Sequence, residues 1–108
     1  MLDTAAGCPA AGVRLVLRRL DGAAAIVTEA VTNQDGRPER PLLEGAAFVH
    51  GTYEIAFHVG DYFRGRGVGL GDLAFLDVVP VRFGISEAAH YHVPLLIAPY
   101  GYSTYRGS

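Results

Sequence analysis

Apolar and polar side chains alternate along four stretches of this chain, and no other feature of the sequence restricts the fold as much. The stretches are residues 13–20, 52–59, 76–85 and 91–98. Successive side chains of a β-strand point to opposite faces of the sheet. A period of two therefore predicts four strands, each with one buried face. Residues 23–32 predict a fifth strand, although their alanines favour strands less strongly.

The predicted core faces consist of the larger apolar side chains of each stretch. They are Val13, Leu15 and Leu17; Tyr53, Ile55, Phe57 and Val59; Val79, Val81, Phe83 and Ile85; and Tyr91, Val93, Leu95 and Ile97.

Turn residues separate the predicted strands, and one segment interrupts the alternation. The turns are expected at Asp21-Gly22, Asn33 to Gly36, Glu44-Gly45 and Tyr100-Gly101. Residues 59–67 predict a short helix that ends at glycine. The glycine-rich residues that follow lack the lysine and the strand-to-helix context of a phosphate-binding loop. Many short strands joined by turns predict an all-β sandwich or barrel.

The composition narrows the range of partners and compartments. The 108 residues predict a single domain, 1–108, and the net charge of -2 argues against nucleic acid or an anionic membrane as the main partner. No stretch reaches the roughly 18 apolar residues that a membrane-spanning helix needs. Cys8 is the single cysteine, so it has no partner for an internal disulfide. We therefore expect a reducing, cytoplasmic location.

His90 and His92 are the main candidates for chemistry. They lie two positions apart on a predicted strand, so their imidazoles share one face. Such a pair is able to bind a metal ion, but no third ligand stands at a suitable spacing, and we expect no metal site. A neutral imidazole is also able to orient or deprotonate water. The third alternative is a structural role, in which the histidines are solvated or hydrogen-bonded to the backbone.

Arg37 follows the predicted turn at Asp35-Gly36. An arginine at this place is ordinarily a surface charge. Its five donors in a fixed plane also suit a planar, anionic heterocycle with several carbonyl oxygens. The residues alone leave both alternatives open.

Five stretches, taken in order, resemble the transthyretin-like 5-hydroxyisourate hydrolases. They are LDTAAGCPAAGV, TNQDGR, GTYEIAFHVGDYF, FLDVVPVRFGI and HYHVPLLIAPYGYSTYRGS. The HYHVPLL strand and the final YRGS are the most specific, because transthyretin, the hormone carrier of the same fold, has neither. The resemblance implies an all-β, two-sheet antiparallel sandwich with one short helix. It also implies a homotetramer with active sites in a channel at the dimer–dimer interface.

The resemblance further implies an activity and a set of site residues. The activity is a ring-opening hydrolysis of 5-hydroxyisourate, a cyclic amide, in the breakdown of urate, without a cofactor. His92, Arg37 and Ser108 are the implied catalytic residues, and His90 has a supporting role. The residues implied to bind the small-molecule substrate are Arg37, Tyr105, Arg106 and Gly107.

One departure from the family pattern concerns the amino-terminal strand. Family members carry His-Val-Leu-Asp where this sequence begins with Met1, Leu2 and Asp3. Two explanations are open: a paralogue that lost the strand and its histidine, or a start set too late. We expect the latter, because loss of an interior strand leaves backbone groups unpaired. The departure also keeps an alternative function open, a decayed hydrolase or a transthyretin-like binding protein without turnover.

Overall fold

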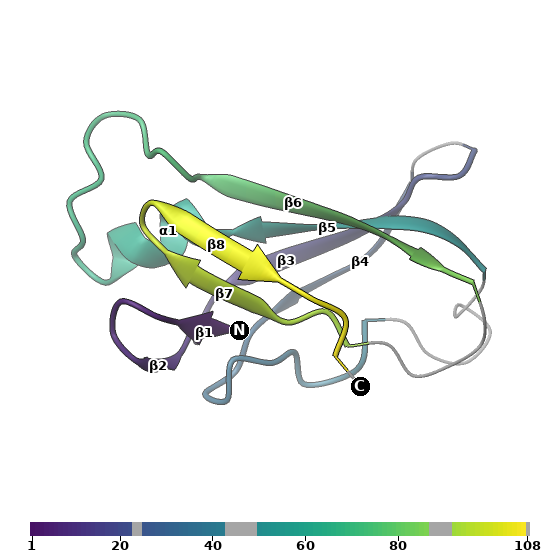
Figure 1. The fold of residues 1–108 in the computed structure, drawn as a ribbon, viewed down its shortest axis with the longest axis horizontal. Coiled ribbons are helices and arrows are strands. Elements are labelled where there is room, and N and C mark those ends of the chain that lie inside the picture. Colours follow the sequence, from purple (N-terminus) through teal and green to yellow (C-terminus); the bar gives the residue numbers. More distant parts are fainter. Residues whose placement is uncertain (23–24, 43–49, 87–91, 108) are drawn as a thin grey trace.

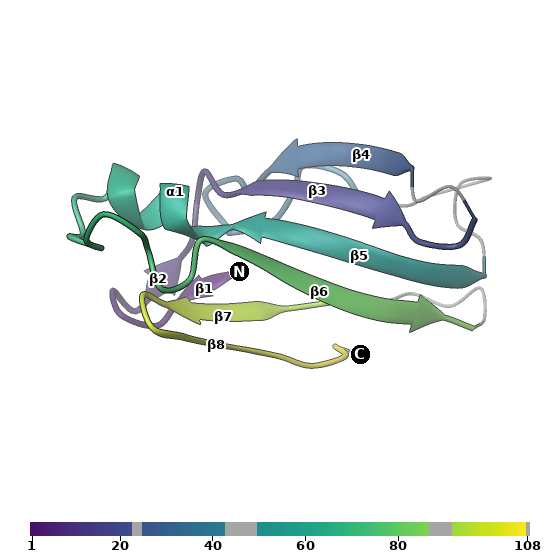
Figure 2. The same ribbon diagram turned by 90° about the horizontal axis from the view of Figure 1, so that it is seen from above.

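The protein consists of two facing β-sheets and one short helix (Figures 1 and 2). The computed structural model describes residues 1–22, 25–42, 50–86 and 92–107. Within these ranges, no helix is long and apolar enough to cross a membrane. The expectation of a two-sheet sandwich with one short helix is confirmed.

The larger sheet contains the long strands that the alternation predicts. Its order is β4 (Ile26–Val31), β3 (Arg14–Arg19), β5 (Gly51–His58) and β6 (Val78–Ile85), and all neighbours are antiparallel. Pro80 lies in β6, which is an edge strand. Proline is tolerated there because an edge strand has one side without ladder bonds.

The smaller sheet contains short strands from both ends of the described chain. Its order is β2 (Cys8–Pro9), β1 (Leu2–Asp3), β7 (Leu95–Ala98) and β8 (Gly101–Thr104). As the resemblance implies, the first strand lies inside its sheet. It runs parallel to β7, whereas the other neighbouring strands of this sheet are antiparallel. The whole larger sheet separates β1 from β7 along the chain, so no hairpin dictates their relative direction.

The predicted strand at residues 91–98 begins later than expected, at Leu95. His92 makes only an isolated bridge with Gly107. Pro94, which lies between this bridge and the strand, has no backbone N–H to donate to a ladder. Tyr91 lies outside the described residues.

The core lies between the two sheets and is formed mainly by the predicted faces, with Ala10, Tyr62, Phe63 and Leu70 in addition. Leu15, Leu17, Phe57 and Val79 are at most 3% exposed. Val16, on the opposite face of β3, is also buried, which the alternation did not predict. Two ion pairs lie on the same outer face of the sheet as Val16. They are formed by Arg14 with Glu29 and by Arg82 with Glu54. The aliphatic stems of such long side chains cover neighbouring apolar surface.

Helix α1 (Val59–Gly65) confirms the predicted helix and attaches to β1 through a buried carboxylate. The Tyr62 hydroxyl donates a hydrogen bond to Asp3 Oδ2 at 2.8 Å. The backbone N–H groups of Ala5 and Ala6 donate to Asp3 Oδ1, each at 3.0 Å. Burial, followed by the hydrogen bond to Asp3, raises the pKa of Tyr62 to about 12. Asp3 thus fixes the start of the smaller sheet against the helix.

Candidate active site

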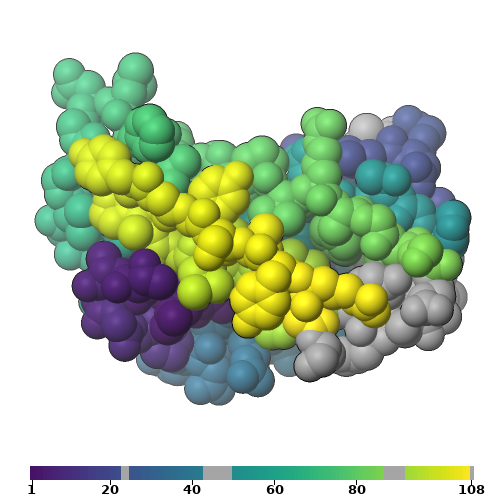
Figure 3. Space-filling model, in the orientation of Figure 1, coloured from purple at the N-terminus to yellow at the C-terminus, as the bar shows by residue number. Residues whose placement is uncertain are grey.

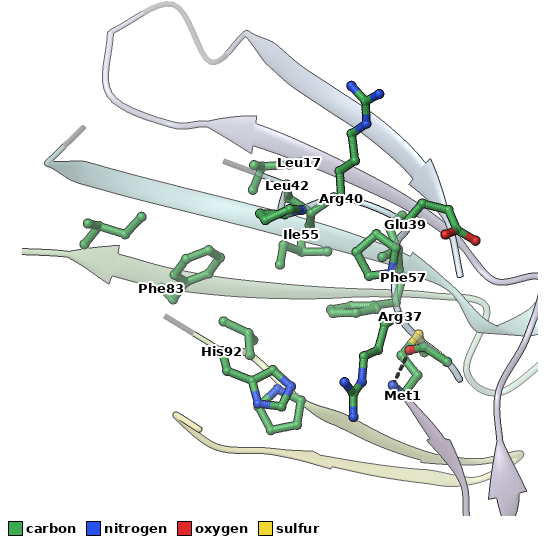
Figure 4. Close-up of a pocket in the computed structure, with 17 residues that line it drawn as sticks. Met1, Leu17, Arg37, Glu39, Arg40, Leu42, Ile55, Phe57, Phe83 and His92 are labelled. Atoms are coloured by element: carbon green, nitrogen blue, oxygen red, sulfur yellow. Dashed lines mark hydrogen bonds between the residues drawn. The ribbon is translucent and has the colours of Figure 1, made fainter. Parts of the chain in front are cut away.

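A cavity of about 540 Å³ opens at the amino end of β1 (Figure 4). Its wall contains core-facing apolar side chains of the larger sheet: Leu15, Leu17, Ile55, Phe57, Phe83 and Ile85. Its rim contains Met1, the segment from Gly36 to Leu42, and the segment from His92 to Pro94. The cavity therefore combines an apolar interior with a charged and polar rim, the usual character of a small-molecule site.

Buried hydrogen bonds attach the end of β4 to the segment before β3. The Thr32 hydroxyl donates to the Ala10 carbonyl at 2.7 Å and accepts from the Val13 N–H at 2.9 Å. Thr32 also donates its backbone N–H to the Val13 carbonyl at 3.0 Å. This junction fixes where the chain leaves the sheet to form the loop that carries Arg37.

Asn33 closes the turn that presents Arg37. Its side-chain oxygen accepts from the backbone N–H of Asp35 at 2.9 Å and of Arg37 at 3.3 Å. Its own N–H donates to the Arg37 carbonyl at 2.7 Å. Gly36 completes the turn with a φ of 75°, a conformation that glycine adopts without strain. The backbone at Arg37 is therefore well determined, and its guanidinium extends to the rim of the cavity (Figure 4).

Met1 packs closely against the same turn. Its amino group donates a hydrogen bond to the Gly36 carbonyl at 2.6 Å. A β-carbon at position 36 would collide with the Met1 carbonyl oxygen, so the close approach requires glycine. Burial lowers the pKa of the Met1 amino group, and the Arg37 guanidinium lowers it further. Arg37 lines the cavity, and its positive charge there favours a bound anion.

His92 reaches the rim from a different part of the fold. It precedes β7 in the smaller sheet, whereas Arg37 follows β4 of the larger sheet. Both side chains point toward the same space (Figure 4). The His92 carbonyl accepts a hydrogen bond of 2.7 Å from the Gly107 N–H, which ties the carboxyl-terminal segment to this histidine. The fold thus places a cation and an imidazole that are far apart in sequence at the rim of one cavity.

The remaining predicted site residues have different positions. Tyr105 and Arg106 are exposed and do not contribute to the lining of this cavity, whereas Gly107 is buried beside His92. His90 and Ser108 lie outside the described residues. Figure 3 shows the carboxyl-terminal segment, in yellow, and the amino-terminal residues, in purple, on the same face of the molecule. The roles predicted for these residues stay predictions.

The sequence did not point to several residues of the rim. Met1, Glu39 and Arg40 line the cavity, together with Pro38 and Pro41. The run Pro-Glu-Arg-Pro was the available signal, because two prolines restrict a loop that follows a tight turn. No group of three His, Cys, Asp or Glu side chains in the described ranges is arranged to hold a metal ion. Because His90 is not described, the expected absence of a metal stays a prediction.

Comparison with known proteins identifies the family. The model of the HIUase/Transthyretin family matches residues 1–107. The chain is 61% identical over 110 residues to 5-hydroxyisourate hydrolase 2 of Rhizobium meliloti strain 1021, covering all of this chain and 92% of that protein.

Solved structures show the same fold. The crystal structure of an (S)-allantoin synthase has a TM-score of 0.94 and 49% sequence identity, over 99% of this chain and 41% of that chain. Transthyretin from Sparus aurata has a TM-score of 0.84 and 26% identity, over 98% of this chain and 90% of that chain. The chain therefore belongs to the HIUase/Transthyretin family and has the transthyretin-like fold.

Proposed function

We propose that this protein is a hydrolase that opens the six-membered ring of 5-hydroxyisourate, as part of purine and urate breakdown. The observation that carries the proposal is the placement of Arg37 and His92 at the rim of one cavity. The name of the Rhizobium meliloti relative supports the choice of substrate. A cytoplasmic location belongs to the same proposal and rests on the single cysteine.

In the proposed reaction, water attacks a carbonyl carbon of the ring while the His92 imidazole accepts a proton from that water. The new C–O bond leaves negative charge on the former carbonyl oxygen, and the Arg37 guanidinium stabilises this charge. When the intermediate collapses, the ring C–N bond breaks, and the departing nitrogen takes the proton from His92. The product carries a carboxyl group in place of the cyclic amide.

The other predicted residues complete the proposed site. Tyr105, Arg106 and Ser108 position the substrate and water, and His90 supports His92. Tyr105 is 61% exposed in the single chain, so a contact with bound substrate or with a second subunit is needed for it to contribute.

We also propose a homotetramer with the active sites at the dimer–dimer interface. Edge strands β6 and β8 each pair with only one neighbour among the described strands. Such edges are open to pairing with a second copy. The rings of Phe75 and Tyr100 are each 70% exposed and lie 5.9 Å apart, centroid to centroid. Large exposed apolar side chains of this kind are typical of subunit interfaces.

Light scattering tests the proposed tetramer. A stable, active monomer contradicts it.

The function is tested with freshly generated 5-hydroxyisourate, whose decay is followed by ultraviolet absorbance. We expect the protein to accelerate the decay well above the rate in buffer, and to keep its activity after prolonged dialysis against a chelator. Decay at the buffer rate rejects the hydrolase. Loss of activity on chelation, with recovery on adding zinc, rejects the metal-free mechanism.

Binding without turnover is the second candidate. It is favoured by one observation, that His92 is the only histidine among the described residues that line the cavity. Calorimetry with a stable analogue of the substrate separates the two candidates when it is combined with the decay assay. Saturable binding without accelerated decay supports the binding protein, and binding with accelerated decay supports the hydrolase.

A further inference from the structure

Gly107 lies directly against the side chain of His92. Its N–H donates a 2.7 Å hydrogen bond to the His92 carbonyl, and the two residues form an isolated antiparallel bridge. Gly107 is buried, although Tyr105 and Arg106 before it are exposed. The chain therefore turns inward at this glycine and packs against the histidine.

The space beside Gly107 is already filled by the imidazole. A β-carbon at position 107 would lie 2.5 Å from His92 Nδ1 and 2.9 Å from both Cβ and Cγ of His92. Real β-carbons do not approach other atoms closer than about 3 Å, because repulsion between electron shells rises steeply there. Any side chain at this position would have to displace the imidazole or the backbone.

Backbone conformation does not explain why this position is glycine. The described glycines with positive φ are Gly7, Gly12, Gly22, Gly36, Gly67 and Gly71, and Gly107 is not among them. Its φ therefore lies outside the left-handed region that favours glycine. The restriction at position 107 therefore comes from the space that His92 occupies.

We infer that Gly107 is a positioning residue. Because it has no side chain, the His92 imidazole is able to pack against its α-carbon in the orientation that faces the cavity. The predicted effect on turnover rests on the proposed function, whereas the predicted effect on the orientation of the imidazole does not. This packing gives Gly107 a role through His92, in addition to the substrate contact that the resemblance implies. A misplacement of about 1 Å in a reacting group is enough to lower turnover by about 100-fold.

The variant Gly107→Ala tests the inference, with Gly101→Ala as its matched control. Gly101 belongs to the same carboxyl-terminal hairpin and has no positive φ, and a β-carbon there meets no atom within 4 Å. We expect Gly107→Ala to lower kcat about 10- to 100-fold with a much smaller change in KM. The chemical shifts of the His92 imidazole and their pH titration, measured by NMR, should change in Gly107→Ala only. Equal kcat values and equal imidazole spectra in the two variants overturn the inference.

A second comparison covers the possibility that Gly107→Ala does not fold. In the double variant His92→Ala/Gly107→Ala, the ring atoms that meet the new β-carbon are absent. We expect this double variant to melt close to His92→Ala and to show no further loss of activity relative to it. A double variant that still fails to fold, or that loses further activity, overturns the inference. If the wild-type protein does not accelerate the decay of 5-hydroxyisourate, the proposed function fails, and the imidazole spectra still decide the role of Gly107.

Discussion

The strands of the larger sheet and those of the smaller sheet are held in place by different kinds of contact. Strand β5 pairs with β6 over eight consecutive positions, from Gly51 opposite Ile85 to His58 opposite Val78. Strand β1 pairs with β7 at only two positions. Specific polar contacts supplement these short pairings: Thr4 Oγ1 donates to the Ile97 carbonyl at 3.0 Å, and Thr104 Oγ1 donates to the Pro94 carbonyl at 2.6 Å.

This difference distinguishes a scaffold, the larger sheet, from the candidate site, whose rim includes His92 beside the smaller sheet. The larger sheet is stabilised by repeated apolar burial, which many sequences with the same alternation achieve. The smaller sheet provides the segment with His92, and its position depends on individual hydrogen bonds. We therefore expect substitutions in the larger sheet to change mainly stability, and substitutions at the rim to change mainly activity.

The largest expected effect is on activity, from substitutions at the rim. His92→Ala removes the proposed proton acceptor, and Arg37→Ala removes the cation that stabilises the developing charge. Each should lower kcat/KM by about 10²- to 10⁴-fold. Both side chains lie at the rim rather than in the core, so the melting temperature should change little. The decay assay and thermal melting measure the two quantities. A large loss of stability in either variant would break the separation of scaffold from site.

The largest expected effect on stability comes from Phe57→Ala. Phe57 is 1% exposed and packs in the core between the sheets. Its truncation should lower the free energy of unfolding by about 3–5 kcal/mol, because it removes buried apolar area and leaves a cavity. Val31→Ala, at a side chain that is 57% exposed, is the control and should cost less than about 0.5 kcal/mol. Urea unfolding of both variants tests the prediction, and similar midpoints refute it.

An intermediate effect on stability is expected where the smaller sheet meets α1. Asp3→Ala leaves three donors without their carboxylate, and it should cost about 1.5–3 kcal/mol. Urea unfolding against the wild-type protein measures this cost. A cost below about 0.5 kcal/mol would show that the polar contacts of the smaller sheet are not needed to hold it.

The same contact predicts a pH dependence. The pKa of Tyr62 is raised from 10.0 to about 12 in the folded protein, so folding favours the protonated phenol. The resulting stability is complete below about pH 10 and is lost as the pH rises through about 12. Melting temperatures should fall less steeply between pH 10 and 12 in Tyr62→Phe, which has no phenol to ionise. Parallel curves for the two proteins contradict the assignment.

The smallest effect is expected on the outer face of the larger sheet. Arg14 and Glu29 form an ion pair in which both side chains are about half exposed. Such pairs contribute at most about 1 kcal/mol. Arg14→Ala and Glu29→Ala should each shift stability by less than that, with a coupling in the double variant that decreases at high salt. A larger, salt-independent coupling would show that this outer face is covered in the assembled protein.

The alternation was sufficient to predict β3, β5 and β6, because each is long enough to show the period of two. Strands β1, β2 and β8 have two to four residues and show no period, so the alternation did not predict them. At β7 the alternation was misleading, because Pro94 interrupts the ladder before Leu95.

The sequence predicted less of the candidate site than of the fold. The resemblance selected Arg37 and His92, but no periodicity relates a residue in the loop after β4 to one in the segment before β7. The contact of Gly107 with His92 depends on the path of the chain in space, and a glycine near a chain end carries no pattern of its own. The same holds for the packing of Met1 against Gly36.

The pairing of β1 with β7 has a consequence for protein synthesis. Residues 14–85 contain all four strands of the larger sheet, so this sheet is able to form while the ribosome is still adding residues. The smaller sheet forms only later, because Leu2 pairs with Leu96, and the N–H of Gly107 donates a hydrogen bond to the His92 carbonyl. During that interval the apolar inner face of the larger sheet is not covered by the smaller sheet, and exposed apolar surface of this kind promotes aggregation. The candidate site is therefore completed only after residue 107 has left the ribosome.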